Sequence, residues 1–122
     1  MTKARCMFVN DATLGLPESS VDYVLSLLER CTVTFDRYRD SEWMGDDLKH
    51  LAAEVDRQVK IERQVVRGAV LAELRRATLP AWAEEMCSTR EAAHPPLIAL
   101  ERLGAVLEQA LVAGIRVQYV SD

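Results

Sequence analysis

The chain has 122 residues, a formal net charge of −4 at pH 7, 49% hydrophobic residues and 28% charged residues. This length and composition predict a single folded domain, residues 1–122, and exclude disordered, collagen-like and disulfide-rich proteins. The acidic balance argues against a nucleic-acid-binding protein, because such proteins usually carry a surplus of basic residues.

The first elements expected are a short strand and a helix. Strand-forming residues occupy positions 5–9. A turn cluster follows, made of Asn10, Asp11, Gly15 and Pro17. Ser19 and Ser20 are candidate N-caps for a helix. Apolar residues then recur at steps of three and four, so this helix ends either near Cys31 or near Tyr38.

A corner and a long helical region are expected next. The sequence from Ser41 to Gly45 predicts a corner, and Asp46 and Asp47 place negative charge where a helix begins. Apolar spacing over residues 46–76 fits one helix, or two helices with a break near residues 59–63.

The last third predicts two helices and a strand. A short helix is expected over roughly 80–88, with a loop from Ser88 to His94. Pro95 opens the final helix, and Gly114 suits its left-handed C-terminal position. Alternation after Gly114 predicts a strand over 115–120.

Together these elements predict a mainly α fold. We expect a helical bundle of four to five helices with a small two-stranded sheet formed by the chain termini. The two strands are expected to pair because their backbone groups otherwise lack partners. Two strands alone are marginally stable, so they should pack on the helices.

The sequence carries none of the common catalytic or phosphate-binding motifs, and we expect no enzyme activity, catalytic residue, cofactor or metal. Cys6, Cys31 and Cys87 are odd in number and widely spaced, which indicates free thiols in a cytoplasmic protein. Asp46, Asp47, His50 and Glu54 could line one helix face as metal ligands, but such rows are common on solvated helices. Trp43 and Trp82 are expected in or beside the core.

Residues 36–47 form the candidate partner-binding surface, because acidic side chains there accompany aromatic residues typical of interfaces. An acidic rim suits a basic protein partner, and neither a membrane nor nucleic acid is expected. The candidate binding residues are Asp36, Tyr38, Asp40, Glu42, Trp43, Asp46 and Asp47. The competing surface is a basic helix face formed by Arg57, Lys60, Arg63 and Arg67.

Two segments are similar to parts of bacterial toxin immunity proteins of the contact-dependent growth inhibition and polymorphic toxin type. They are SEWMGDDLKHLAAEVD (Ser41–Asp56) and ALVAGIRVQYVSD (Ala110–Asp122). The resemblance implies a non-catalytic, cytoplasmic protein that binds a cognate, basic toxin and covers its active site or substrate groove. The alternatives are another small interaction or regulatory domain, for example phage-encoded, and a small enzyme using His50 or His94 with nearby carboxylates.

Overall fold

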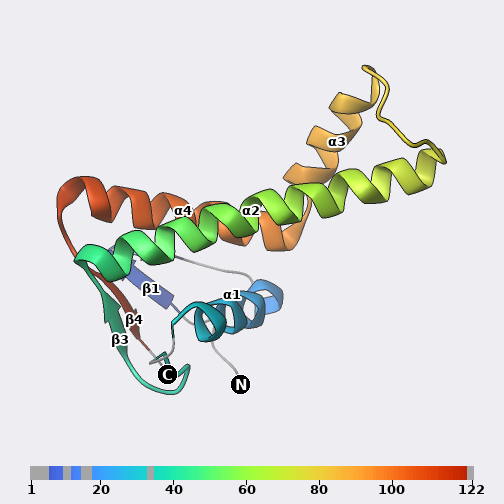
Figure 1. Ribbon diagram of the computed structural model, residues 1–122. Coiled ribbons are helices and arrows are strands. Elements are labelled where there is room, and N and C mark those ends of the chain that lie inside the picture. Colours follow the sequence, from blue (N-terminus) through green and yellow to red (C-terminus); the bar gives the residue numbers. More distant parts are fainter. Residues whose placement is uncertain (1–5, 10–11, 15–17, 33–34, 121–122) are drawn as a thin grey trace.

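The computed structural model describes residues 6–9, 12–14, 18–32 and 35–120, and it is mainly α-helical. Four helices and four short strands follow one another along the chain (Figure 1). They are β1 (Cys6–Val9), β2 (Ala12–Leu14), α1 (Glu18–Cys31), β3 (Ser41–Trp43), α2 (Gly45–Leu74), α3 (Ala83–Ala92), α4 (Pro95–Ala113) and β4 (Val117–Val120). No helix in these described ranges is both long and apolar enough to cross a lipid bilayer.

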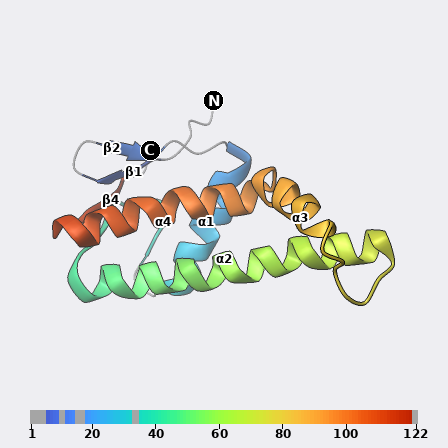
Figure 2. The same cartoon turned by 90° about the horizontal axis from the view of Figure 1, so that it is seen from above.

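The helices form two layers with the sheet. Helices α2 and α4 run side by side in opposite directions, and α1 and the sheet lie against one face of this pair (Figures 1 and 2). The far end of α2 extends past α1 and the sheet and packs against α3, which gives the molecule a projecting arm. We define the arm as residues 63–92.

The core lies between α1, the first half of α2, α4 and the sheet. Every third or fourth residue of α4 is buried there, as the leucine spacing predicts. The largest fully buried side chains of this core are Val24, Leu28, Leu48, Leu51, Val55, Leu100, Leu103, Leu107, Val117 and Tyr119. Gly114 ends α4 in the left-handed conformation with φ of 68°, as predicted.

The predicted pairing of the chain ends is confirmed. Strands β1 and β4 are antiparallel, and Val9 lies opposite Val117. The sheet has four strands rather than two, in the order β2-β1-β4-β3. Strands β2 and β3 have three residues each, too few for alternation to show in the sequence. They form because β1 and β4 each offer an unpaired edge.

Several boundaries differ from expectation. Helix α1 starts at Glu18, so Ser19 and Ser20 are not its N-caps; of the two expected ends, Cys31 is the observed one. Helix α2 is continuous over 30 residues. Helix α3 begins and ends later than expected, and its final turns replace most of the loop predicted from Ser88. The turn residues Asn10, Asp11, Gly15 and Pro17 lie outside the described residues.

Candidate functional site

The candidate surface, residues 36–47, is assembled from three elements. It begins in the connection after α1, continues through β3 and ends in the first turn of α2. Gly45 has φ of 59°, a conformation that glycine adopts without steric cost, at the turn from β3 into α2. Strand β3 is held by pairing with β4, in which Glu42 lies opposite Gln118. We call residues 36–47 the acidic corner.

An aromatic cluster supports the acidic corner from below. The Phe35 ring stacks on Trp43 at 5.6 Å between centroids, and it meets Tyr119 edge-on at 5.1 Å. Trp43 and Tyr119 are almost fully buried, and Trp43 Nε1 donates a hydrogen bond to Thr32 Oγ1 at 3.4 Å. Trp43 is therefore a core residue, which confirms its expected position in or beside the core, and its role in partner binding stays a prediction. Strand β3 points the Trp43 side chain inward, toward Phe35.

Arg37 fastens the loop of the acidic corner to α1. Its guanidinium donates to Asp22 Oδ1 at 2.8 Å and to both carboxylate oxygens of Glu29, at 2.5 and 3.0 Å. The hydrogen bond from Arg37 holds the pKa of Glu29 below its usual value. The Tyr119 hydroxyl donates to the Arg37 carbonyl oxygen at 2.8 Å. These contacts fix the loop between α1 and the sheet.

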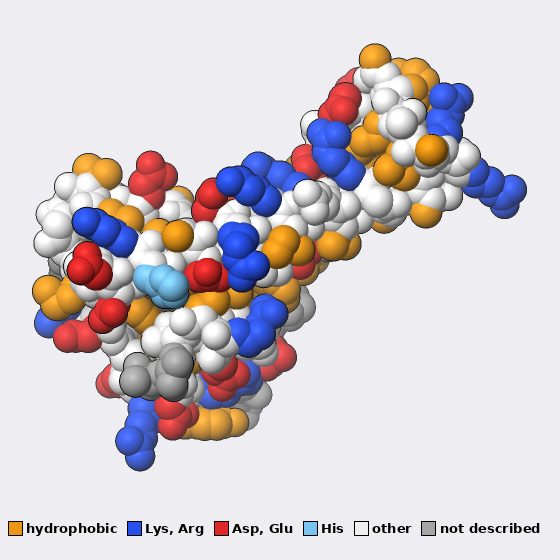
Figure 3. All heavy atoms as spheres, in the orientation of Figure 1, with side chains coloured by type: hydrophobic (Ala, Val, Ile, Leu, Met, Phe, Trp, Pro, Cys, Tyr) orange, Lys and Arg blue, Asp and Glu red, His pale blue; other side chains and the backbone are white. Residues whose placement is uncertain are grey.

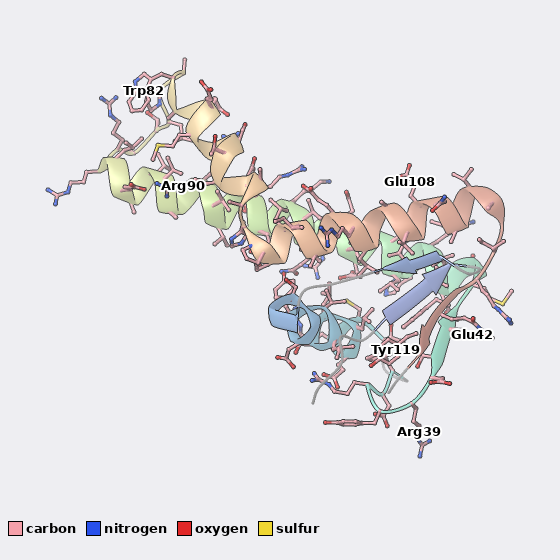
Figure 4. The ribbon with its side chains drawn as sticks, turned by 180° about the vertical axis from the view of Figure 1, so that it is seen from behind. Arg39, Glu42, Trp82, Arg90, Glu108 and Tyr119 are labelled. Atoms are coloured by element: carbon pink, nitrogen blue, oxygen red, sulfur yellow. The ribbon has the colours of Figure 1, made fainter. Side chains whose placement is uncertain are left out.

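The remaining candidate residues are all on the surface. They are Asp36, Tyr38, Asp40, Glu42, Asp46 and Asp47. Tyr38 has 74% of its surface exposed. Arg39 and Glu42 lie at the outside of the corner, whereas Tyr119 lies on its inner side (Figure 4). Five carboxylates therefore surround a fixed corner.

Basic side chains near these carboxylates offset only part of their charge. Asp36 accepts a hydrogen bond from the Tyr38 amide at 2.9 Å and lies 3.8 Å from Arg39. Glu42 lies 3.4 Å from Arg116. Since residues 36–47 hold five acids and two arginines, and Arg37 is taken up by α1, the surface keeps an acidic surplus.

A pocket of about 280 Å³ opens beside β3. Phe35 and Trp43 are among its buried walls, and Glu42, Asp47 and His50 stand on its exposed side. An aromatic wall with carboxylates at the rim suits a cationic or aromatic side chain. We call this the corner pocket.

Cys31 also lines the corner pocket, and burial raises the pKa of its thiol. A thiol with a raised pKa is a weak nucleophile at neutral pH, because the thiolate is the reactive form. Cys31 and Cys87 are both free cysteines.

One member of the possible metal-ligand row, Glu54, is paired with an arginine. Glu54 accepts hydrogen bonds from Arg57, the shorter at 2.7 Å, which lowers the pKa of Glu54. Among the described residues, no group of three or more His, Cys, Asp or Glu side chains is arranged to hold a metal ion.

The competing basic face is neutralised within the molecule. Each of its four cations lies within 4 Å of a carboxylate. The pairs are Arg57–Glu54, Lys60–Asp56, Arg63–Glu101 and Arg67–Glu84. Ion pairs of both signs are typical of a solvated helix face. This face is therefore a weaker candidate for binding than the acidic corner.

A polar cluster that the sequence reading missed joins three helices. Glu62 Oε2 lies 2.9 Å from His94 Nε2, and Glu62 Oε1 accepts a hydrogen bond from the Tyr23 hydroxyl at 3.0 Å. Burial raises the pKa of Tyr23. Residues 39 and 32 positions apart are brought together here; only the packing of α1 and α4 on α2 does this.

Trp82 was expected in or beside the core, and this expectation is wrong. The residue stands at the far end of the arm with 61% of its surface exposed (Figure 4).

No family model, curated protein or solved structure matches the chain. Its function is therefore inferred from its own geometry.

Proposed function

We propose that this protein is a non-catalytic binding protein whose acidic corner covers a basic surface of a cognate protein. The kind of partner that fits the toxin-immunity resemblance is a basic toxin domain, met in the cytoplasm, whose active site or substrate groove is covered. One observation carries the proposal. Five exposed carboxylates and the exposed Tyr38 lie on a loop, on β3 and on the first turn of α2, and the loop and strand are held from below by buried aromatic rings and by Arg37.

Rigidity matters because binding then orders few additional side chains. Loss of side-chain and loop freedom opposes association, and a surface already held in place loses less. Tyr119 ties the loop to the sheet while Arg37 ties it to α1. The acidic corner is thus preorganised for a partner.

Charge at the acidic corner favours rapid encounter with a basic partner. Complementary charges steer diffusing proteins together, and salt screens this attraction. Asp46 and Asp47 also lie in the first turn of α2, where the exposed amide groups favour negative charge. These two carboxylates are the natural positions for a charge-reversal test.

The test begins by isolating the partner with the purified protein as bait and identifying it by mass spectrometry. Association is then measured at low and high salt for wild type, for Asp46→Lys with Asp47→Lys, and for the matched control Arg63→Glu with Arg67→Glu. We expect the corner reversal to slow association and to reduce its salt dependence. Tyr38→Ala should instead speed dissociation, because central aromatic residues at interfaces contribute over ~2 kcal/mol. Loss of binding only in the arginine variant would place the site on the other face.

One observation favours the enzyme alternative enough to test it. The Glu62 carboxylate contacts His94 as a residue orienting a general base would, at 2.9 Å. A pocket of about 310 Å³ lies beside His94. His94→Ala and His50→Ala should both keep full partner neutralisation under the binding proposal, and loss of it without unfolding would support a chemical role. Retained partner binding with no neutralising effect would instead indicate another kind of interaction or regulatory domain.

A further inference from the structure

The far end of the arm carries features that the acidic corner does not explain. Residues 75–82 connect α2 to α3, and we call them the tip. Figures 1 and 2 show the tip projecting well away from the sheet and from the acidic corner. Arg75 adopts the left-handed conformation with φ of 54° where α2 ends. The tip is thus a protruding turn at the opposite end of the molecule from the acidic corner.

The tip has an unbalanced positive charge. It contains Arg75 and Arg76 and no acidic residue. The nearest acids on either side, Glu73 and Glu84, are paired with arginines within the arm, at 2.5 Å to Arg90 and 2.8 Å to Arg67. Both tip arginines are exposed, and neither has an acidic partner within the described part of the chain. Blue side chains accordingly stand out at this end of the molecule in Figure 3.

The tip also exposes a large aromatic side chain. Trp82 has 61% of its surface exposed, and the Arg76 guanidinium carbon lies 6.0 Å from the centroid of its ring. A large apolar residue on a protruding turn marks an interaction site more often than an ordinary surface does. Tryptophan and arginine are the residue types that contribute most at protein interfaces. A site complementary to the tip would combine carboxylates with an apolar pocket for the tryptophan ring.

The corner pocket of this same chain has those properties. Its volume of about 280 Å³ is below that of most small-molecule sites and suits a single inserted side chain. Phe35 and Trp43 provide aromatic wall, and Glu42 and Asp47 provide carboxylates at the rim. The tip and the corner pocket are therefore complementary in charge, and both carry aromatic side chains.

We propose that the tip of one copy inserts Trp82 into the corner pocket of a second copy, with Arg76 meeting the carboxylates at the rim. The two surfaces lie at opposite ends of one molecule, so the contact joins different copies head to tail. Such a contact uses two different surfaces and therefore extends into chains or closes into rings. A knob of one turn buries little area, and the association is therefore weak and sensitive to salt.

This self-association rests on the proposed function, because it occupies the acidic corner that a basic partner would cover. The two events compete for the same carboxylates. Binding of the partner to the acidic corner should therefore dissociate the assembly.

The first test measures molar mass by light scattering and by sedimentation equilibrium, at protein concentrations up to about 1 mM. The wild-type mass should rise above the 13.7 kDa of the monomer as concentration increases, and less so at high salt. Trp82→Ala and Asp47→Lys should each remain monomeric over the same range. Val112→Ala changes an apolar residue of α4 that is 85% exposed, and this matched control should associate like wild type.

The second test mixes the two monomeric variants. Trp82→Ala keeps an intact pocket and Asp47→Lys keeps an intact tip, so one contact remains possible between them. The equimolar mixture should reach twice the monomer mass and stop there, because no further intact pair of surfaces is left. Circular dichroism of each variant checks that its fold is unchanged.

A wild-type protein that stays monomeric at every concentration overturns the proposal. Association that persists in both variants overturns it as well, and so does a mixture that remains monomeric. Affinity for the basic partner separates the two proposals, since Trp82→Ala should bind that partner like wild type. If self-association is absent and partner binding depends on the acidic corner, only the inference fails.

Discussion

The acidic corner and the arm are built in opposite ways. At the corner, short segments with little regular structure are held by buried rings and by the multiple hydrogen bonds of Arg37. In the arm, two regular helices face each other. Residues 63–92 all lie in the described part of the chain, and only four of their side chains are buried. They are Val66, Val70, Ala83 and Cys87. Regular secondary structure is therefore a poor guide to where this molecule is stable, because stability follows buried apolar contact.

Ion pairs in the arm do not compensate for its small number of buried apolar side chains. Arg67 and Arg90 reach acids on the opposite helix, but all four side chains are about half exposed. Exposed pairs contribute little, with a median of about 0–1 kcal/mol. We expect the arm to open locally more often than the body of the protein.

The largest expected effect compares the two tryptophans. Trp43→Ala should lower the free energy of unfolding by about 3–5 kcal/mol, because it removes a buried ring from the aromatic cluster. Trp82→Ala should change it by no more than about 0.5 kcal/mol, because the ring is mostly exposed. Urea denaturation of both variants measures the difference. Equal effects would mean that the tip is packed as firmly as the corner.

The next comparison uses two buried valines of the same helix. Val55 in the body is 1% exposed and Val70 in the arm is 0% exposed. Val55→Ala should lower the global free energy of unfolding by about 2 kcal/mol. Val70→Ala should mainly increase amide hydrogen exchange within residues 63–92 and leave exchange in α1 and α4 unchanged. Equal loss of protection throughout the molecule would show that arm and body unfold as one unit.

A smaller effect is expected from the Arg37 clamp. Arg37→Ala should cost about 1 kcal/mol, since its carboxylate partners are partly exposed, and should speed amide exchange over residues 35–40. The variant also changes the response to acid. The folded-state pKa of Glu29 lies below the ordinary value of 4.5, so its contribution is present above that value and is lost as pH falls through the lower pKa.

Wild type should therefore lose more stability in this acid range than Arg37→Ala does. The difference in stability between the two proteins should become smaller as the pH falls. Thermal melts from neutral pH downward test this. Arg39→Ala is the matched control, because Arg39 is 85% exposed and lies 3.8 Å from its nearest acid. If the difference in melting temperature is the same at all pH values, the pairing of Arg37 with Glu29 does not contribute to stability.

The smallest expected effect concerns thiol chemistry. Burial raises the pKa of Cys31, so alkylation of Cys31 in the folded protein should be slower at neutral pH than in the unfolded chain. Cys87 is 1% exposed in the arm and should react only when the arm opens. Peptide mass spectrometry after timed alkylation gives each rate. Faster modification of Cys87 than of Cys31 would locate the weaker packing in the arm.

The mainly helical fold and the two terminal strands follow from the sequence, which left open whether residues 46–76 form one helix or two. Helix hydrogen bonds join residues four apart, so the apolar spacing of α2 and α4 and the position of Gly114 are readable locally. The alternation after Gly114 likewise marked β4, and the strand at the other terminus was the natural partner for it. The acids of the corner were also identified, because exposure of charged residues follows from solvation alone.

Tertiary structure decided the rest. Strands β2 and β3 exist because β1 and β4 offer hydrogen-bonding edges, and three-residue segments carry no pattern of their own. Packing also sent Trp43 into the core and left Trp82 in solvent. Trp43 follows a polar run and Trp82 follows Leu79, Pro80 and Ala81, so the local sequence does not predict which ring is buried. The Arg37 and Glu62 contacts join residues up to 82 positions apart. Such pairs are fixed by how the helices and the sheet pack together, which no local spacing records.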